Sequence, residues 1–450
     1  MATTYLTFTT GSAGNRLLWT WSGWVKKTDL TANGTLFFAG GSNSDYSKIL
    51  LSTNGALYIS EVGGGSTVWE VQTNRLFRDP SAYYHMVFVY DSAQSTASDR
   101  LKIYINGVQE TSFAVSSYPA QNRGAMWLAG GTDHRIGRDY VSQYFGGIIS
   151  DINFSDGYAY GPETFGETDT DTGEWRIKDN PSFSLGTYGF TILKNGNTIT
   201  DQSTNSNNWS LGGGTLTNTL DCPANVFSTL NPLANVIAPV TLSEGNLKIA
   251  MTNSKGGNLS TISCTDGKYY AEMKITTAPQ DFRFHWGIMP HPVIAADDPI
   301  NAANAGIMLS GYNAVIYAAN GIINNFYGNA TGRFSGNPIL GLAIDLKSAT
   351  RTMAISVNGA WVTGSNATDT DFSNALKVDI TSYVATYPNW FIGCGSGNGS
   401  GTTGVYELNF GNPIFTGTDQ ADGNGYGSFE YPPPSGYLAL CSLNLSEELS

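Results

Sequence analysis

The sequence predicts an all-β protein in which two β-sandwiches follow one another along the chain. Glycine accounts for 53 of 450 residues, charged residues make up only 13%, and aromatic residues reach 12%. This composition is typical of many short strands joined by tight turns, so we expect few helices. A chain of this length is too long for one compact core and long enough for two.

Two segments of the same design indicate that the sandwich plan occurs twice. Residues 84–109 hold an apolar run, a polar loop and an alternating strand that ends at an Asn-Gly pair, 106–107. Residues 339–359 repeat this order and end at a second Asn-Gly pair, 358–359. Alternation with a period of two indicates a half-buried strand, and Asn-Gly favours a type I′ turn, whose two central residues need positive φ. We therefore predict one such hairpin in each sandwich.

The strands of the first sandwich follow in order along the chain. Residues 5–9 form the first, and residues 17–27 form a longer strand that holds Trp19, Trp21 and Trp24. Because the pattern alternates and a lysine pair ends it, we interpret the tryptophans as core residues; a sugar-stacking platform is the alternative. Further strands are expected at 35–39, 47–52, 56–60, 67–72, 126–129, 135–137 and 147–154. A spacing of about ten residues per strand is typical of a sandwich or barrel.

Several short motifs run through residues 1–165: WTWSGWVKK, YYHMVFVYD, LKIYING, RIGRD and GGIISDINFSDG. In this order they resemble the laminin G-like members of the concanavalin A-like lectin/glucanase superfamily. The resemblance implies a jelly-roll sandwich of two antiparallel sheets. More narrowly, RIGRD followed by FGETDTDTGEW resembles a domain that recurs in structural proteins of tailed bacteriophages.

The second half carries its own series of motifs. Residues 166–239 have a weaker pattern and are expected to connect the sandwiches; a strand is predicted at 189–193, whereas 201–214 is rich in Asn, Ser and Gly and is typical of a long loop. Within 240–450 the motifs SCTDGKYYAEMKI, HWGI, NPILGLAIDL, ISVNG, YELNFGNPIF and PSGYLALCSL resemble SPRY domains. That resemblance implies a second concanavalin-like jelly-roll sandwich in tandem, acting as a binding module without catalytic residues.

Charge and hydropathy exclude several classes of partner. The net charge is −13 and no Lys/Arg block occurs, so we expect no nucleic acid partner. No window holds the roughly 18 apolar residues of a membrane span, and the first ten residues lack the features of a secretion signal. We therefore expect assembly in a host cytoplasm. The four cysteines show no metal spacing and are interpreted as unpaired thiols, with a disulfide as the alternative.

The motif FGETDTDTGEW holds the carboxylates that catalysis or metal binding would need. Retaining glycosidases use two carboxylates about 5–5.5 Å apart. Carboxylates spaced two residues apart along a strand, or nearly so, would lie on one face of it. The only candidate set with such spacing is Glu167, Asp169, Asp171 and Glu174. The interspersed Thr and Gly indicate a surface loop, so we predict no enzyme activity. Asp169 and Asp171 are also candidate ligands of a calcium ion, with Gly173 allowing the turn. A solvated acidic loop is the favoured interpretation, and Ca²⁺ is the only cofactor that the pattern suggests.

Ligand-binding residues are expected in the loops at the ends of a sandwich. A mixture of aromatic, amide and carboxylate groups suits the ring faces and hydroxyls of sugars. The candidates are Asp139, Tyr140, Gln143 and Tyr144, with His134 shortly before them and Trp361 in the second sandwich. Packing or plain surface is the alternative for each. His85 lies inside an apolar strand and is interpreted as a core histidine.

Taken together, these features predict a non-enzymatic virion structural protein of a tailed phage. The favoured role is a tail fibre or adhesin that binds a host-surface glycan, contacts other virion proteins and forms a homo-oligomer. A capsid decoration or head-fibre protein is the alternative. A polysaccharide-degrading glycosidase is the third.

Overall fold

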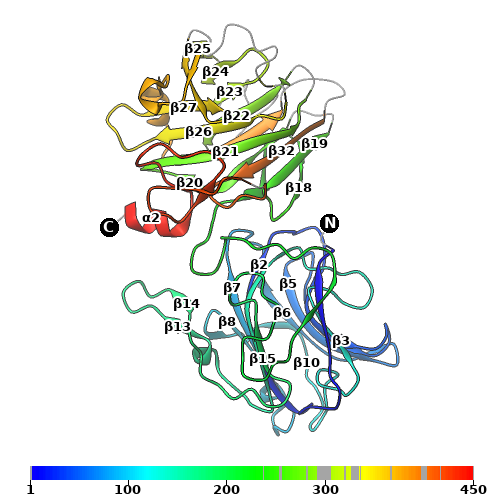
Figure 1. Ribbon diagram of the computed structural model, residues 1–450. Helices are drawn as coiled ribbons and strands as arrows, with labels where there is room; N and C mark the ends of the chain where they lie inside the picture. Colours follow the sequence, from blue (N-terminus) through cyan, green and yellow to red (C-terminus); the bar gives the residue numbers. More distant parts are fainter. Residues whose placement is uncertain are drawn as a thin grey trace. The chain divides into compact units, whose positions relative to one another are not determined.

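The computed structural model describes residues 3–236, 238–252, 256–279, 282–290, 306–318, 321–325, 334, 336–364, 367–396, 403–415 and 417–448. The chain divides into two compact units, Met1–Ala224 and Asn225–Ser450, which we call unit 1 and unit 2. Strands dominate both units (Figure 1), and the α-helices of the described part are short: α1 (Thr381–Val384) and α2 (Ser442–Glu448). The predicted all-β class is confirmed.

The strands of unit 1 form two main antiparallel sheets and one hairpin. Their bounds are β1 (Tyr5–Thr9), β2 (Leu18–Lys27), β3 (Gly34–Gly40), β4 (Tyr46–Leu51), β5 (Ala56–Gly63), β6 (Ser66–Leu76), β7 (Tyr84–Asp91), β8 (Leu101–Ile105), β9 (Val108–Gln109), β10 (Phe113–Ser117), β11 (Asp133–Ile136), β12 (Gly147–Asp156), β13 (Gly166–Thr168), β14 (Trp175–Ile177), β15 (Phe190–Ile192) and β16 (Ser210–Gly213). The eight-stranded sheet has the order β10-β6-β5-β4-β3-β11-β1-β16, and the six-stranded sheet has the order β15-β12-β2-β7-β8-β9.

Inward-facing side chains of both sheets form one core in unit 1, as a sandwich requires. Trp19 and Trp21 are fully buried in it, and the ring of Trp19 stacks on Tyr90 with centroids 5.2 Å apart. Trp24 points to the opposite face of β2, where it stacks on the buried ring of His85 at 4.8 Å. The interpretation as core residues is confirmed for Trp19 and Trp21, whereas Trp24 and His85 are buried outside this core, on the opposite face of the sheet.

Both predicted Asn-Gly hairpins are present and share their details. The φ angles are 48° and 80° at residues 106–107, and 50° and 79° at residues 358–359, as a type I′ turn requires. In each case an aromatic ring from later in the chain covers the glycine: Trp175 in unit 1 and Tyr431 in unit 2. A Cβ at either glycine would overlap that ring. The two units are therefore built on the same hairpin design.

The segment that we expected to connect the sandwiches contributes strands to both units. Strand β15 pairs with β12, β16 pairs with β1, and the next strand, Leu230–Val236, belongs to unit 2. The expectation of a long loop at 201–214 is wrong at its end, because Trp209 is buried and packs edge-on against Phe190 with ring centroids 5.1 Å apart. This aromatic contact packs the start of β16, the edge strand of the eight-stranded sheet, against β15 of the six-stranded sheet.

Unit 2 also has two main antiparallel sheets, together with a two-stranded sheet formed by β33 and β34. Its strands are β17 (Leu230–Val236), β18 (Thr241–Ser243), β19 (Lys248–Thr252), β20 (Gly256–Cys264), β21 (Lys268–Thr277), β22 (Phe284–Pro290), β23 (Ile307–Ser310), β24 (Val315–Ala318), β25 (Gly321–Asn325), β26 (Ile339–Asp345), β27 (Thr352–Val357), β28 (Ala360–Gly364), β29 (Ala367–Asp369), β30 (Val378–Asp379), β31 (Trp390–Ser396), β32 (Thr403–Asn409), β33 (Gln420–Ala421) and β34 (Ser428–Phe429). One sheet has the order β17-β20-β31-β22-β23-β24-β25; the other has the order β18-β19-β32-β21-β26-β27-β28-β29, with β30 beside β27.

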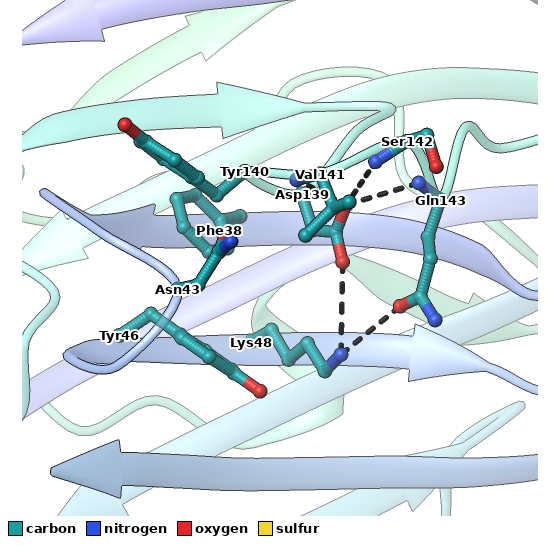
Figure 2. A pocket seen from close by; sticks show the side chains of 9 residues that line it. All are labelled: Phe38, Asn43, Tyr46, Lys48, Asp139, Tyr140, Val141, Ser142 and Gln143. Carbon is teal, nitrogen blue, oxygen red and sulfur yellow. Dashed lines mark hydrogen bonds and ion pairs between the residues drawn. The ribbon is translucent and has the colours of Figure 1, made fainter. Parts of the chain in front are cut away.

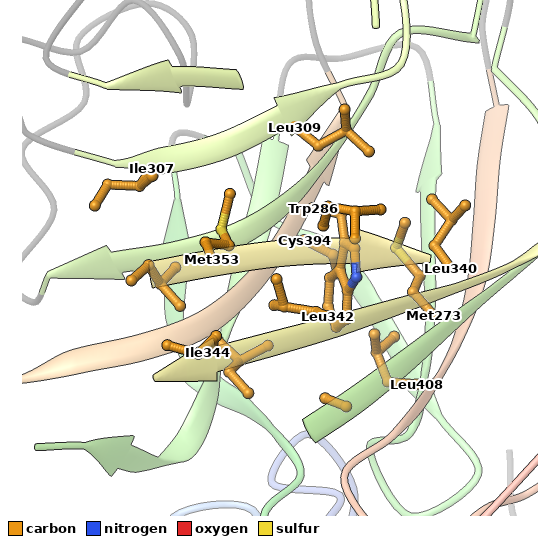
Figure 3. Close-up of a cluster of buried hydrophobic side chains, with 14 of the residues drawn as sticks. Met273, Trp286, Ile307, Leu309, Leu340, Leu342, Ile344, Met353, Cys394 and Leu408 are labelled. Carbon is orange, nitrogen blue, oxygen red and sulfur yellow. The ribbon is translucent and has the colours of Figure 1, made fainter. Parts of the chain in front are cut away.

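The core of unit 2 lies between these sheets (Figure 3). Trp286 from one sheet and Met273, Leu342 and Met353 from the other are fully buried in it. Cys394 is buried in the same cluster, and all four cysteines of the chain are unpaired thiols. Among the described residues, no helix is both long and apolar enough to cross a bilayer.

Candidate ligand-binding site

A shallow hollow of about 290 Å³ lies on the outer face of the eight-stranded sheet of unit 1, and we call it the loop hollow (Figure 2). Strands β3 and β4 form its floor, and the loop that follows β11 forms one wall. The lining residues are Phe38, Asn43, Tyr46, Lys48, Asp139, Tyr140, Val141, Ser142 and Gln143. Strand alternation explains the floor, because Ile49 and Leu51 face the core whereas Tyr46 and Lys48 face outward.

The carboxylate of Asp139 shapes the wall of the loop hollow. Its Oδ1 accepts hydrogen bonds from the backbone N–H groups of Val141, Ser142 and Gln143 at 3.0–3.1 Å. The backbone carbonyl of Asp139 accepts a further bond from Arg135 Nη1 at 3.0 Å. Because the Asp139 side chain is almost wholly buried by these contacts, it fixes the loop rather than facing a ligand.

Lys48 joins the floor to the wall. Its Nζ donates a hydrogen bond to Gln143 Oε1 at 3.0 Å and lies 3.7 Å from Asp139 Oδ2 (Figure 2). It also lies 5.2 Å from the centroid of the Tyr46 ring. Burial lowers the pKa of Lys48, and Asp139 and Glu70 partly offset that effect. An ammonium has three N–H donors, so Lys48 can hold this geometry and also donate to a ligand hydroxyl.

Aromatic rings border the loop hollow on the side opposite Gln143 (Figure 2). Tyr140 is 41% exposed, and the guanidinium of Arg135 lies 5.3 Å from its ring centroid, which holds the ring in place. Rigid tyrosines supply contact area at a low entropy cost, while Asn and Gln supply adaptable hydrogen bonds. The hollow thus combines ring faces with amide and ammonium groups, which is the chemistry that recognises a polyhydroxylated ring.

The structure brings three of the predicted ligand-binding residues together: Asp139, Tyr140 and Gln143. Tyr144 lies outside the lining of the hollow, where its ring contacts the guanidinium of Arg138 at 4.9 Å. Its place in sequence beside Gln143 therefore does not bring it to the site.

His134 and Trp361 are buried and are corrected here as ligand-binding candidates. His134 is 2% exposed, with Nε2 accepting the backbone N–H of Leu128 at 3.0 Å. Trp361 is 4% exposed and packs edge-on against Phe372, with centroids 4.7 Å apart. The sequence indicated a loop at His134 and an aromatic ring at Trp361, but it did not indicate that either side chain is buried.

The proposed calcium ligands lie in the turn of the β13-β14 hairpin. Asp169 Oδ1 accepts the backbone N–H groups of Asp171 and Thr172 at 2.9 Å, and Oδ2 lies 2.6 Å from Arg176 Nη1. The bonds from Thr172 and Asp171 lower the pKa of Asp169. Both oxygens of the Asp169 carboxylate therefore already contact donor groups of the protein. In the part of the chain that the structure describes, no three His, Cys, Asp or Glu side chains gather as a metal site would need.

Sequence reasoning missed the floor of the hollow: Phe38, Asn43, Tyr46 and Lys48. The signal that was present is the outward set Tyr46 and Lys48 in the strand YSKILL, which follows the polar turn GSNSD. The sequence does not tell which strand lies beneath the 139–143 loop, because that depends on the sheet order β4-β3-β11.

Comparison with known proteins agrees with this architecture. Residues 1–163 match the family model described as the concanavalin A-like lectin/glucanases superfamily. The matched residues lie within unit 1, so this unit is similar to laminin G-like domains of the concanavalin-like superfamily. None of the curated proteins compared with the chain matches it.

Solved structures that are similar to this chain at low sequence identity include a SPRY domain, a pair of laminin domains and a CBM40 domain. The SPRY domain of human HERC1 is 11% identical, with a TM-score of 0.28, and the match covers 40% of this chain and 96% of that one. Domains LG4-5 of the mouse laminin alpha1 chain are 10% identical, with a TM-score of 0.29, over 95% of this chain and 84% of that one. The CBM40 domain of Ruminococcus gnavus IT-sialidase is 15% identical, with a TM-score of 0.27, over 33% of this chain and 80% of that one.

Proposed function

We propose that the protein is a glycan-binding structural protein of a tailed-phage virion and that unit 1 presents the loop hollow to a host-surface glycan. The observation that carries the proposal is the joint placement of Tyr46, Tyr140, Lys48 and Gln143 in a solvent-facing hollow. The match of unit 1 to a lectin superfamily supports it. The virion setting is supported by the phage-like motifs RIGRD and FGETDTDTGEW.

The proposed function is binding without bond cleavage. A glycosidase needs one carboxyl group that is free to donate a proton and a second one placed to act with it. In the loop hollow Asp139 is held by three backbone N–H groups. On the β13-β14 hairpin, Glu167 and Asp169 both pair with the guanidinium of Arg176. These engagements support a binding role over the glycosidase alternative, which release of reducing ends by the wild type but not by Glu167→Ala would revive.

Unit 2 is proposed to hold the protein to other virion proteins, within a homo-oligomer. Its resemblance to SPRY binding modules supports this division of roles. In the capsid decoration or head-fibre alternative, both units would contact only protein. Electron microscopy of particles distinguishes the two, because an adhesin belongs at the tail tip and a decoration protein on the capsid lattice.

The glycan-binding role is tested on a glycan array with the purified full chain, once with calcium and once with a chelator. We expect binding, and we expect Tyr140→Ala to weaken it about tenfold through the loss of one stacking contact. Tyr312→Ala is the matched control, because Tyr312 is 51% exposed but lies in unit 2. Absence of binding under both conditions, or equal loss in both variants, would contradict the proposal.

A further inference from the structure

A second hollow of about 450 Å³ opens on the same face of unit 1 and shares Tyr46, Lys48 and Gln143 with the loop hollow. We call it the sheet hollow. Its floor is formed by outward-facing side chains of β4, β5 and β6, among them Leu50, Tyr58, Ser60, Val62 and Glu70. Three shared residues make the two hollows neighbours on one continuous surface.

The strand register aligns the floors of both hollows. Phe38 lies opposite Lys48, Lys48 opposite Ser60, and Ser60 opposite Glu70, so the row crosses four adjacent strands from β3 to β6. Neighbouring strands are roughly 4.8 Å apart, which gives the row a length of about 14 Å. One sugar ring is too short to contact all of this row. A chain of rings laid across the strands is long enough.

Apolar and aromatic groups flank this row on both sides. Tyr46 lies opposite Val62, and Leu50 lies opposite Tyr58, all on the outward face. Tyr140 borders only the loop hollow, and Tyr58 borders only the sheet hollow, whereas Tyr46 borders both. Each hollow therefore has an aromatic ring of its own and one ring at their junction.

The charges of the surface select against an anionic ligand. Lys48 is the only basic residue among the described residues that line either hollow, and the acidic ones are Asp139 and Glu70. The ammonium of Lys48 is already paired with Asp139. A uronic or sialic acid carboxylate would therefore meet Glu70 without a free cation to offset it, whereas neutral hydroxyls meet no such repulsion.

We infer that the two hollows are consecutive subsites for one extended, uncharged oligosaccharide, with Tyr46 and Lys48 at the junction between them. This inference rests on the proposed glycan-binding function and adds the length and the charge of the ligand. The sheet hollow makes the affinity depend on the length of the oligosaccharide. The preference for uncharged sugars follows because carboxylates outnumber cations in the lining of the two hollows.

Calorimetric titration of the full chain with oligosaccharide ladders tests both parts. The neutral probes are the laminari-, cello- and malto-oligosaccharides from mono- to hexasaccharide, and the acidic probes are oligogalacturonates and sialyllactose. For at least one neutral series, we expect affinity to rise at least about tenfold between the mono- and the tetrasaccharide, and we expect acidic probes to bind at least about tenfold more weakly.

Variants of single tyrosines test whether the rise in affinity with oligosaccharide length comes from the sheet hollow. We expect Tyr58→Ala to abolish the rise in affinity with ligand length, and Tyr140→Ala to weaken binding at every length. Tyr46→Phe, which keeps the ring, is expected to preserve the length gain, and Tyr46→Ala to remove it; circular dichroism checks that each variant is folded. Tyr312→Ala is the control.

Affinity that is independent of ligand length, or a Tyr58→Ala variant that binds every length like the wild type, overturns the subsites but leaves the proposed function standing. If the acidic probes bind more tightly than the neutral ones, the charge preference is overturned. If no neutral series binds, the whole inference is overturned.

Discussion

Acidification from pH 7 to pH 5 is expected to cost unit 1 on the order of 2 kcal/mol of unfolding free energy for each of its histidines, His85 and His134. Burial lowers the pKa of His85 to about 3 and that of His134 to about 4. An unfolded histidine has a pKa of about 6.5. Since the folded pKa is the lower one, the stabilisation is complete above pH 6.5 and is lost as the pH falls toward 4 and 3.

Hydrogen bonding explains why neither ring accepts a proton easily. The Nδ1 atom of His85 accepts the indole N–H of Trp175 at 3.0 Å, and the Nε2 atom of His134 accepts the backbone N–H of Leu128 at 3.0 Å. A proton on either nitrogen would face an N–H donor inside the protein. Each bond would be lost, and the buried donor would be left without an acceptor.

Asp151 affects the pH dependence of the unfolding free energy in the opposite direction to the two histidines. Its contribution therefore has to be measured separately from theirs. Burial raises its pKa to about 6, above the unfolded value, so its contribution is present at low pH and is lost as the pH rises through 6. Between pH 7 and pH 5 it returns about 1.4 kcal/mol. Asp151→Asn removes this term, and asparagine tolerates the φ of 48° at this position.

Urea unfolding at pH 7 and pH 5 measures these effects. We expect unit 1 to lose about 4 kcal/mol in the Asp151→Asn variant and about 2.5 kcal/mol in the wild type. Adding His85→Gln and His134→Gln to the variant should flatten its pH dependence, whatever the change in absolute stability. Unfolding free energies that are equal at both pH values in the Asp151→Asn variant would show that the buried rings do not control acid stability.

The second large effect is expected from Glu272 in unit 2. Replacing Glu272 by alanine should lower the unfolding free energy of unit 2 on the order of 3–5 kcal/mol. Its carboxylate is fully buried and accepts bonds from the hydroxyl of Tyr270 at 3.2 Å, Asn409 Nδ2 at 3.0 Å, and the backbone N–H groups of Glu430 and Tyr431 at 2.9 Å. Alanine would remove the acceptor that these four donors share.

Two further variants control the Glu272 experiment. Glu272→Gln keeps the volume and one carbonyl acceptor, so we expect an intermediate loss. Glu407→Ala removes a glutamate on the neighbouring strand β32 that pairs with a part-exposed partner, Lys248, at 3.0 Å. Pairs of this kind contribute about 1 kcal/mol or less. Thermal unfolding that ranks Glu407→Ala as the more damaging change would contradict the role assigned to the buried carboxylate.

The fold was predictable because its signals are local. Alternation marks β8 and β27, and an Asn-Gly pair follows each of them, where the structure has a type I′ turn. Contacts between distant parts of the chain left no such signal. Lys26 is fully buried with Asp221 at 2.6 Å, although 195 positions separate them, and neither residue type suggests burial.

The candidate site was only half predictable for the same reason. The loop wall was found because Asp, Tyr and Gln occur together in residues 139–143, a turn-forming segment. The floor was missed because Phe38, Tyr46 and Lys48 look like ordinary members of two strands. Whether an outward residue faces open solvent or a loop depends on the strand order, which a single sequence does not specify.

Hydrogen exchange of the full chain, free and saturated with a glycan identified on the array, tests the central claim most directly. If the outer face of the eight-stranded sheet is the binding surface, peptides covering residues 38–50 and 139–143 will exchange more slowly in the complex, while peptides of unit 2 will not change. Protection confined to unit 2 or to the β13-β14 hairpin would place the ligand elsewhere and contradict the account.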